Sequence, residues 1–465
     1  MLMISALNLK LSKIALVIIV LFNLVVAIVL MEYFWNLSKI DYSNTTNWKE
    51  ISGYFNKEGY KPAKISTPGL EGSGYVLEPG NVQFKFINPK AKSGSPEKIL
   101  QDNDYVYQEM FKNKITEPKD MDIETIRPPD PEKINSYQRA NATIIALVRN
   151  SEVSGIGRSI QKFEKSFNGK FKYPYTFIND APFSDKFKAK MRKFSDAPME
   201  FVEIPRQLWD KPSFIDSEKE KSMMLALARH NVAYAMKPSY HNMCRFYSGN
   251  FYNVPELQKY KYYWRIEPDV KFYSDIRYDI FKYLQGTGKV YGFTVNLYDI
   301  DETLTTLWPE TLKYLNEDDN FKYVNENGAF QWLLENQQNP KKNANTGGYS
   351  TCHFWSNFEI GDMDFFRGEA YNKWFQHLDQ SGGFYYERWG DAPVHSMGLA
   401  LFADKSKIHW FRDIGYFHDP YLNCPNSDST KNCKIGTFSR WKHLNDQNCM
   451  GSWIDYSMEG MEKVY

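Results

Sequence analysis

Apolar residues between positions 140 and 270 alternate between two spacings, which predict strands and helices in turn. The run 143–148 is short, apolar and rich in β-branched residues, as expected of a buried parallel strand. In 153–167 apolar residues recur at steps of three and four, the spacing of an amphipathic helix. Further strands are predicted at 175–178, 200–204 and 262–266, and further helices at 184–194 and 217–236.

This alternation predicts an α/β fold with a mostly parallel central sheet flanked by helices. Ligands of such sheets bind at the carboxyl ends of the strands, so the residues after 143–148 and 262–266 are the first candidates for a site. Gly155-Ile-Gly157 follows the first strand as a dinucleotide-binding loop would. However, Ile160 occupies the third glycine position and the turn from Val148 is too long, which excludes a Rossmann cofactor site.

The N-terminal stretch 14–31 carries no formal charge, and Asn23 is its one polar residue. As a helix it would be about 27 Å long, close to the thickness of a bilayer core. Lys10 and Lys13 precede it, which predicts a cytosolic tail at 1–13, a transmembrane signal-anchor at 14–31 and type II topology. A stem is expected at 32–70 and one lumenal catalytic domain at 71–465, its core starting near residue 137. A cleaved signal peptide is the alternative, although its apolar core is usually shorter.

Composition excludes several classes of function. Lysine plus arginine number 57 against 56 aspartate plus glutamate, so the basic excess of a nucleic-acid-binding protein is missing. Aromatic residues make up 16% of the chain, a share that suits both a large core and the floor of a sugar site. The sequence contains no HExxH, P-loop or GxSxG motif, so it does not indicate a zincin, a P-loop NTPase or an α/β-hydrolase.

The five cysteines show no CxxC spacing, so neither a zinc ribbon nor a thioredoxin motif is indicated. One or two disulfides would fit an oxidising lumen. Cys424 and Cys433 could close a short loop, and Cys244 with Cys352 is a second option. The odd number leaves at least one thiol, unless that thiol pairs between chains.

The segment 265–269, RIEPD in sequence, lies where the predicted strand 262–266 ends. Arg265 opens it, and the carboxylates of Glu267 and Asp269 flank Pro268. Carboxylates suit a hard divalent cation, and a diphosphate can supply the remaining ligands. His418 could complete the shell, because imidazole binds transition metals such as manganese. The alternatives are an exposed acidic loop and a structural histidine.

Three further residues are candidates for sugar chemistry. Glu359 lies in an aromatic stretch, 352–362, where a buried carboxylate is costly unless it is paired or used; an exposed glutamate at a strand end is the alternative. Asp391 is bracketed by glycine and proline, which predicts a fixed loop. Tyr240 could stack on or hydrogen-bond a sugar, or pack in the core. His353 and His395 are weaker candidates.

Five sequence blocks, in this order, resemble one family. They are YWRIEPDV at 263–270, HFWSNFEI at 353–360, FRGEAY at 366–371, ERWGDAPVH at 387–395 and GYFH at 415–418. The chain resembles the fungal α-1,2-mannosyltransferases of the KRE/KTR/MNT group, glycosyltransferase family 15, from about residue 139 to about residue 424. The resemblance implies a GT-A fold, GDP-mannose as donor, Mn²⁺, retention of the α configuration and a place in the Golgi membrane. The acceptors would be α-mannosides on N-linked or O-linked glycans.

The resemblance also implies roles for single residues. Glu267 and His418 would bind the metal, and Asp391 would hold the donor mannose. The remaining roles would be donor nucleotide or phosphate binding by Arg149 and Arg265, acceptor binding by Tyr240 and catalysis by Glu359. Glu359 would either form a covalent glycosyl intermediate or steady the cationic sugar while the acceptor attacks from the same face.

Two other classes compete with a transferase. A retaining glycoside hydrolase would use a carboxylate pair such as Glu359 and Asp391. A catalytically inactive, lectin-like protein of the secretory pathway would bind mannose without consuming GDP-mannose. The acidic strand end at Glu267 and the histidine at His418 favour the transferase over the hydrolase, since most hydrolases need neither metal nor nucleotide.

Overall fold

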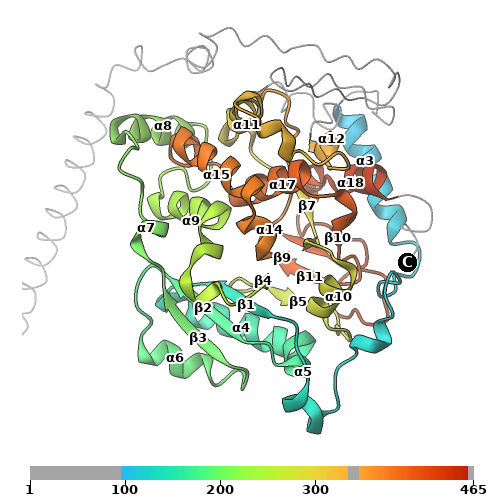
Figure 1. The fold of residues 1–465 in the computed structure, drawn as a ribbon. Coiled ribbons are helices and arrows are strands. Elements are labelled where there is room, and N and C mark those ends of the chain that lie inside the picture. Colours follow the sequence, from blue (N-terminus) through green and yellow to red (C-terminus); the bar gives the residue numbers. More distant parts are fainter. Residues whose placement is uncertain (1–95, 334–344, 459–465) are drawn as a thin grey trace, which may run out of the picture. The chain divides into compact units, whose positions relative to one another are not determined.

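The computed structural model describes residues 96–333 and 345–458 of the 465. Their central element is a seven-stranded sheet with strand order β10-β6-β9-β4-β1-β2-β3 (Figure 1). Its strands are β1 (Ala142–Leu147), β2 (Tyr175–Asn179), β3 (Met199–Glu203), β4 (Tyr262–Arg265), β6 (Tyr291–Phe293), β9 (Glu359–Asp362) and β10 (Ile408–Trp410). Neighbouring strands run parallel except that β9 is antiparallel to both β4 and β6. The predicted mostly parallel sheet is confirmed.

Helices cover both faces of this sheet (Figure 1). The longer ones are α3 (Pro96–Met110), α4 (Val153–Phe163), α6 (Asp185–Met191), α8 (Ser217–Arg229), α9 (Pro238–Gly249), α10 (Ile280–Thr287), α11 (Leu307–Asn316), α15 (Glu369–Ser381), α17 (Asp391–Phe402) and α18 (Met450–Ser457). The shorter ones are α5 (Gly169–Phe171), α7 (Arg206–Trp209), α12 (Phe330–Leu333), α14 (Met363–Arg367) and α16 (Gly383–Tyr386).

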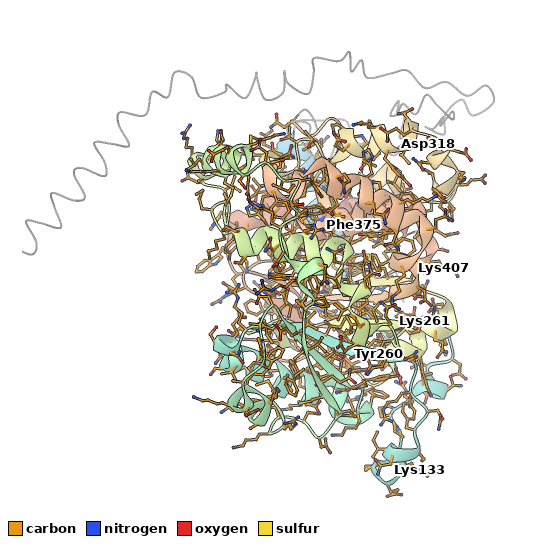
Figure 2. All side chains as sticks on the ribbon, turned by 60° about the vertical axis from the view of Figure 1, so that its left-hand side comes forward. Lys133, Tyr260, Lys261, Asp318, Phe375 and Lys407 are labelled. Atoms are coloured by element: carbon orange, nitrogen blue, oxygen red, sulfur yellow. A yellow bond between two sulfur atoms is a disulfide. The ribbon has the colours of Figure 1, made fainter. Side chains whose placement is uncertain are left out.

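Alternation along β4 divides the core between the two faces. Tyr263 joins the buried cluster under α9, α14, α15 and α17, whereas Trp264 joins the cluster under α4, α6 and α10. Trp264 packs edge-on against Phe163 of α4, with ring centroids 4.7 Å apart. Many of the aromatic residues therefore serve to fill the core. Helices also approach closely: a Cβ at Gly249 of α9 would lie 2.2 Å from the ring of Phe375 of α15, which Figure 2 labels.

The predicted strands and helices are found with shifted ends, and one helix was predicted too long. Ser184 caps α6 by accepting a hydrogen bond from the backbone of Phe187, as the sequence indicated. The helix predicted at 217–236 ends instead at Arg229, because Asn231 and Tyr234 adopt left-handed backbone angles, with φ of 58° and 63°. Pro238 does not end that helix but begins the next one, α9, where its fixed φ suits the first turn.

Two small sheets complete the fold around the site. One has the order β12-β11-β5, with β5 (Lys271–Phe272), β11 (Tyr416–His418) and β12 (Tyr421–Asn423) all antiparallel. The other pairs β7 (Asn296–Tyr298) with β8 (Cys352–Phe354). Because β5 follows the acidic segment directly and pairs with β11, the first of these sheets brings His418 back to the end of β4.

Two disulfides are present among the described cysteines. The predicted Cys424–Cys433 bond is confirmed. The suggested Cys244–Cys352 pair is wrong: Cys352 of β8 is bonded to Cys449, which caps α18, across 97 residues of sequence. Cys244 is a buried free thiol in α9. Sequence spacing identified the short loop but could not identify a partner that distant.

The predicted cytosolic tail, signal-anchor and stem at 1–70 lie outside the described residues. Within 96–333 and 345–458, no helix is both long enough and apolar enough to cross a membrane.

Candidate active site

Arg265, the last residue of β4, contacts three carboxylates at once. Its Nη1 donates to Asp391 Oδ2 at 2.6 Å and lies 3.8 Å from Glu359 Oε1, and its Nη2 donates to Glu267 Oε1. Its guanidinium lies 3.6 Å from the centre of the Tyr247 ring, and the residue is 5% exposed. Arg265 and Glu359 are directly opposite in the β4–β9 pairing, so strand register places them together.

Glu267 and His418 face each other next to Arg265. Glu267 Oε2 lies 3.4 Å from His418 Nε2. Burial alone would raise the pKa of Glu267, but Arg265 and then His418 hold it at about 2, so the carboxylate is ionised. Burial likewise would lower the pKa of His418, and its hydrogen bond with Glu267 raises it instead. A carboxylate oxygen and an imidazole nitrogen at this distance fit a manganese ion, for which both are good ligands.

Asp269 does not join this pair. Its carboxylate is ion-paired with Arg158 of α4, and its backbone φ is 64°. The turn packs on the start of α4 so closely that a Cβ at Gly155 would lie 3.0 Å from the Cβ of Pro268. No group of three or more histidine, cysteine or acidic side chains is arranged for a metal within the described residues. Among the described residues, Glu267 and His418 are therefore the candidate pair of metal ligands at this position.

Glu359 begins β9 and is fully buried, so the alternative of an exposed glutamate is wrong. Its Oε2 accepts two hydrogen bonds, from the Tyr291 hydroxyl and from His395 Nδ1, each at 2.9 Å. Its Oε1 receives no hydrogen bond from the described residues and has Arg265 as its nearest cation. The two oxygens of this carboxylate are thus in different environments.

From the sequence, His395 is one of the weaker candidates for a site residue, yet it is in direct contact with Glu359. Its Nε2 lies 2.8 Å from the carbonyl oxygen of Tyr247, and the ring is fully buried. Burial alone would lower the pKa of His395, but the charge of Glu359 raises it above the usual histidine value. One sequence signal could have found it: Asp391 and His395 are four residues apart, which places them on the same face of α17.

Asp391 is the first residue of α17, so the predicted fixed loop is in fact a helix N-terminus. A negative charge is favourable there. Besides Arg265, the hydroxyl of Ser356 donates to its Oδ2 at 2.7 Å. Ser356 follows β8 in the block 353–360, and no spacing in that block marks it as a site residue. These contacts fix the orientation of the Asp391 carboxylate.

Tyr240 lies between a buried arginine and an exposed ring. Arg388, whose backbone φ is 115°, donates to the Tyr240 hydroxyl at 3.3 Å and lies 3.8 Å from Asp299 Oδ1. On its other side the Tyr240 ring stacks on Tyr234, with centroids 4.7 Å apart and planes 17° from parallel. Tyr234 is 50% exposed. An aromatic surface therefore extends from Arg388 to solvent.

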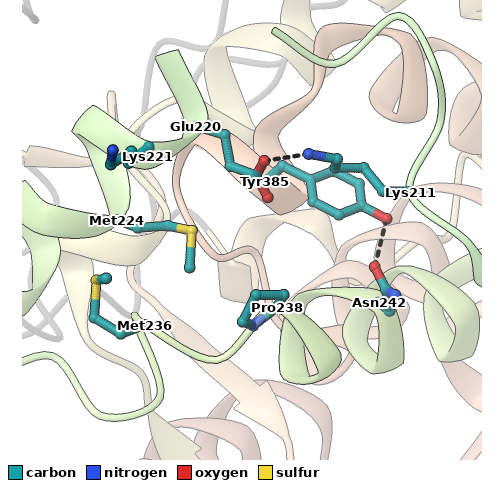
Figure 3. A pocket seen from close by; sticks show the side chains of 8 residues that line it. All are labelled: Lys211, Glu220, Lys221, Met224, Met236, Pro238, Asn242 and Tyr385. Carbon is teal, nitrogen blue, oxygen red and sulfur yellow. Dashed lines mark hydrogen bonds and ion pairs between the residues drawn. The ribbon is translucent and has the colours of Figure 1, made fainter. Parts of the chain in front are cut away.

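A pocket of about 300 Å³ lies between α8, α9 and α16, but it is separate from this surface (Figure 3). It is lined by Lys211, Glu220, Lys221, Met224, Met236, Pro238, Asn242 and Tyr385. Figure 3 shows Lys211 paired with Glu220, and the Tyr385 hydroxyl donating to Asn242 at 3.0 Å. Asn242 is two residues after Tyr240, about 200° around the helix, so the two side chains leave α9 on opposite sides.

Arg149 is exposed at the carboxyl end of β1. Because β1 and β4 are parallel and Ile145 is opposite Arg265, the residues after both strands lie at the same edge of the sheet. Five of the residues predicted for the site form one connected cluster: Glu267, His418, Arg265, Asp391 and Glu359. Tyr240 and Arg149 lie outside this cluster.

Comparison with known proteins agrees with this geometry. A family model described as glycolipid 2-alpha-mannosyltransferase matches residues 97–458. The chain is 47% identical over 374 residues to the probable mannosyltransferase KTR4 of Saccharomyces cerevisiae, covering 79% of each sequence. The crystal structure of S. cerevisiae Ktr4p in complex with GDP superimposes with a TM-score of 0.76 at 46% identity, covering 84% of this chain and 97% of that one. The crystal structure of core-mannan synthase A of Aspergillus fumigatus, in its Mn/GDP form, superimposes with a TM-score of 0.70 at 43% identity. The match covers 75% of this chain and 93% of that one.

Proposed function

The chain belongs to glycosyltransferase family 15, the glycolipid 2-alpha-mannosyltransferases, and from this premise we propose that it transfers mannose from GDP-mannose to an α-mannoside. The transfer would depend on Mn²⁺, retain the α configuration and form an α-1,2 linkage on a GT-A fold. The observation that carries the proposal is the pair of Glu267 and His418 beside the buried Arg265, at the carboxyl end of β4. Relatives have been crystallised with GDP and in a Mn/GDP form.

Glu267 and His418 would hold the manganese, which would neutralise charge on the diphosphate leaving group. Arg149 is exposed at the same edge and can reach a phosphate. Arg265 would serve the donor mainly by fixing carboxylates, because both its Nη groups are already engaged by Glu267 and Asp391. Its Nε has no hydrogen-bond partner among the described residues and could donate to a donor oxygen. Asp391, held at the start of α17, would orient the donor mannose.

For Glu359 we favour the role of a fixed negative charge over that of a covalent nucleophile. Its Oε1 is buried and receives no hydrogen bond from the described residues, so attack on the anomeric carbon would require a rearrangement, whereas electrostatic support would not. In this route the acceptor hydroxyl oxygen bonds to the anomeric carbon as the bond to the diphosphate breaks. The proton passes to the departing phosphate oxygen.

Intact-mass measurement of the enzyme with GDP-mannose, without acceptor, separates the two routes. The fixed-charge route predicts no adduct. A hexosyl adduct that disappears in Glu359→Gln would establish the covalent route instead.

The acceptor would bind on the stacked pair Tyr240 and Tyr234. Aromatic faces pack against the apolar faces of sugars, and Arg388 fixes the Tyr240 hydroxyl. Both N-linked and O-linked mannose chains present a terminal α-mannose to such a surface.

We also propose a Golgi location, with residues 14–31 as a type II membrane anchor and the catalytic domain in the lumen. The Cys352–Cys449 and Cys424–Cys433 disulfides support an oxidising compartment. A protease-protection assay on intact Golgi vesicles would leave the catalytic domain undigested until detergent is added. Digestion without detergent would contradict the orientation.

The reaction itself is tested with the full chain in detergent, by GDP release from GDP-mannose and methyl α-mannoside with and without Mn²⁺. We expect metal-dependent release and, by NMR, an α-1,2-linked dimannoside. A β-linked product would contradict retention. Equal rates after chelation would contradict the metal site.

A further inference from the structure

His395 is bound on both ring nitrogens by groups that only accept hydrogen bonds. Nδ1 lies 2.9 Å from a carboxylate oxygen of Glu359, and Nε2 lies 2.8 Å from the carbonyl oxygen of Tyr247. A neutral imidazole carries a single N–H and could satisfy only one of them. Because the ring is fully buried, water cannot supply the missing proton donor. A doubly protonated ring makes both bonds, and the Glu359 carboxylate supplies the opposite charge that a buried imidazolium needs.

The groups packed around the His395 ring either carry negative charge, accept hydrogen bonds or are aromatic. Glu359 comes from β9, Asp391 lies one turn earlier on α17, and the Tyr247 carbonyl comes from α9. Three rings also lie near it, those of Phe366 at 4.8 Å, Tyr371 at 6.3 Å and Phe251 at 6.4 Å between centroids. Burial raises the pKa of Tyr247, Tyr371 and Tyr291, the last of which donates to the same Glu359 oxygen.

We propose that His395 is a positioning residue for mannosyl transfer: its imidazolium, together with the Tyr291 hydroxyl, engages Oε2 of Glu359 and leaves Oε1 as the oxygen that serves the donor sugar. This rests on the proposed function of Glu359. A carboxylate this deep needs hydrogen-bond donors and a counter-charge on its inner side, and His395 and Tyr291 supply them at Oε2.

Two substitutions separate the two hydrogen bonds of His395. In His395→Asn the amide nitrogen replaces Nδ1, so the bond to Glu359 is kept without the charge. In His395→Gln the amide nitrogen extends toward the Nε2 position, so the bond to the Tyr247 carbonyl is kept and that to Glu359 is lost. We expect kcat to fall roughly 10-fold in the His395→Asn variant and roughly 100-fold in the His395→Gln variant. KM for GDP-mannose should stay within about twofold in both, since neither bond involves the nucleotide.

The pH profile gives a readout that a structural role would not change. His395 is charged below its raised pKa and loses the proton as pH rises through it. Wild-type kcat should therefore decline on the alkaline side, and His395→Asn, which has no charge to lose, should lack that decline. An unchanged profile in the variant would overturn the proposal.

His241 provides a matched control. It is also fully buried, and its two ring nitrogens also face carbonyl oxygens, those of Phe384 and Ala235, at 2.7 and 2.9 Å, but no carboxylate. His241→Asn and His241→Gln should lower stability while the folded protein keeps its kcat. If the His395 variants lose activity only in step with their folded fraction, as these controls do, His395 is structural and the proposal is wrong.

Two measurements remain decisive if the His395 variants do not fold. In wild-type protein, ¹⁵N NMR of the ring should show both nitrogens protonated at pH 7, and a neutral tautomer would overturn the proposal. Tyr291→Phe keeps the ring and removes the second donor to Oε2, and its kcat should fall about 10-fold. The NMR result does not depend on turnover. Failure of the proposed function, seen as no GDP-mannose consumption by wild type, is therefore distinguishable from failure of this inference.

Discussion

Asp391→Asn tests whether the carboxylate at the start of α17 acts on the donor sugar or only on Arg265. The wild-type carboxylate accepts a 2.6 Å hydrogen bond from Arg265 and a 2.7 Å hydrogen bond from Ser356. The charged side chains of Arg265 and Asp391 are both buried. Asparagine keeps an acceptor but removes the charge. A hydrogen bond to a charged group is worth about 1.5–3 kcal/mol, so the free energy of unfolding should fall by about 2–3 kcal/mol. Proteins of ordinary stability remain folded after such a loss.

Asp379→Asn is the matched control, because Asp379 makes a pair elsewhere whose side chains are only 8% and 12% exposed. It accepts from Arg245 Nε at 2.6 Å and from Arg245 Nη2 at 2.8 Å, between α15 and α9. Urea unfolding should show similar losses for both variants. Only Asp391→Asn should lose activity, by about 10²-fold in kcat, since it removes a group proposed to contact the reacting sugar.

Binding of GDP and of GDP-mannose, measured by calorimetry, locates the defect. Asp391→Asn should bind GDP as wild type does and GDP-mannose more weakly, because the proposed contact is with mannose. Weaker GDP binding in parallel would refute the assignment and show that Asp391 acts through Arg265 on the nucleotide site. An equal loss of kcat in Asp379→Asn would show that the activity follows stability alone.

Three further outcomes are expected. Glu267→Ala should weaken Mn²⁺ binding in the presence of GDP about 10–100-fold by calorimetry; unchanged binding would remove Glu267 from the metal site. Tyr234→Ala should raise the acceptor KM several-fold and leave the KM for GDP-mannose unchanged, whereas Tyr105→Ala, which removes a tyrosine that is 64% exposed on α3, should change neither. Cys352→Ala should reduce the free energy of unfolding by about 4–5 kcal/mol, because the bond to Cys449 closes a 97-residue separation; a loss below about 1 kcal/mol would contradict this.

The strands around the site were predictable because local pattern determines them. The run at 143–148 is β1 with a shift of one residue, and the end of β4 carries the acidic segment as expected. The end of α8 was not predictable from apolar spacing alone, since the apolar pattern continues past Arg229 while the backbone turns left-handed at Asn231.

The partners of the site residues could not be predicted, because they depend on which strands become neighbours. Glu359 lies opposite Arg265 only because β9 inserts antiparallel between β4 and β6, and that same insertion brings Tyr291 to its Oε2. Apolar periodicity contains no information on strand order. The spacing of four residues between Asp391 and His395 could have indicated one shared helix face, but a fixed loop was predicted there instead of α17.

One guanidinium serves three functional carboxylates, and the consequence is energetic coupling. Arg265 bonds the proposed metal ligand Glu267 and the proposed sugar ligand Asp391 and attracts Glu359, so removing any one of them releases the arginine toward the other two. Each single substitution will therefore also change what the other two carboxylates contribute to stability. Double-mutant cycles between Glu267 and Asp391, measured by urea unfolding, should show an interaction free energy of about 0.5–3 kcal/mol that vanishes when Arg265 is replaced. The three carboxylates would then contribute to stability as a single thermodynamic unit.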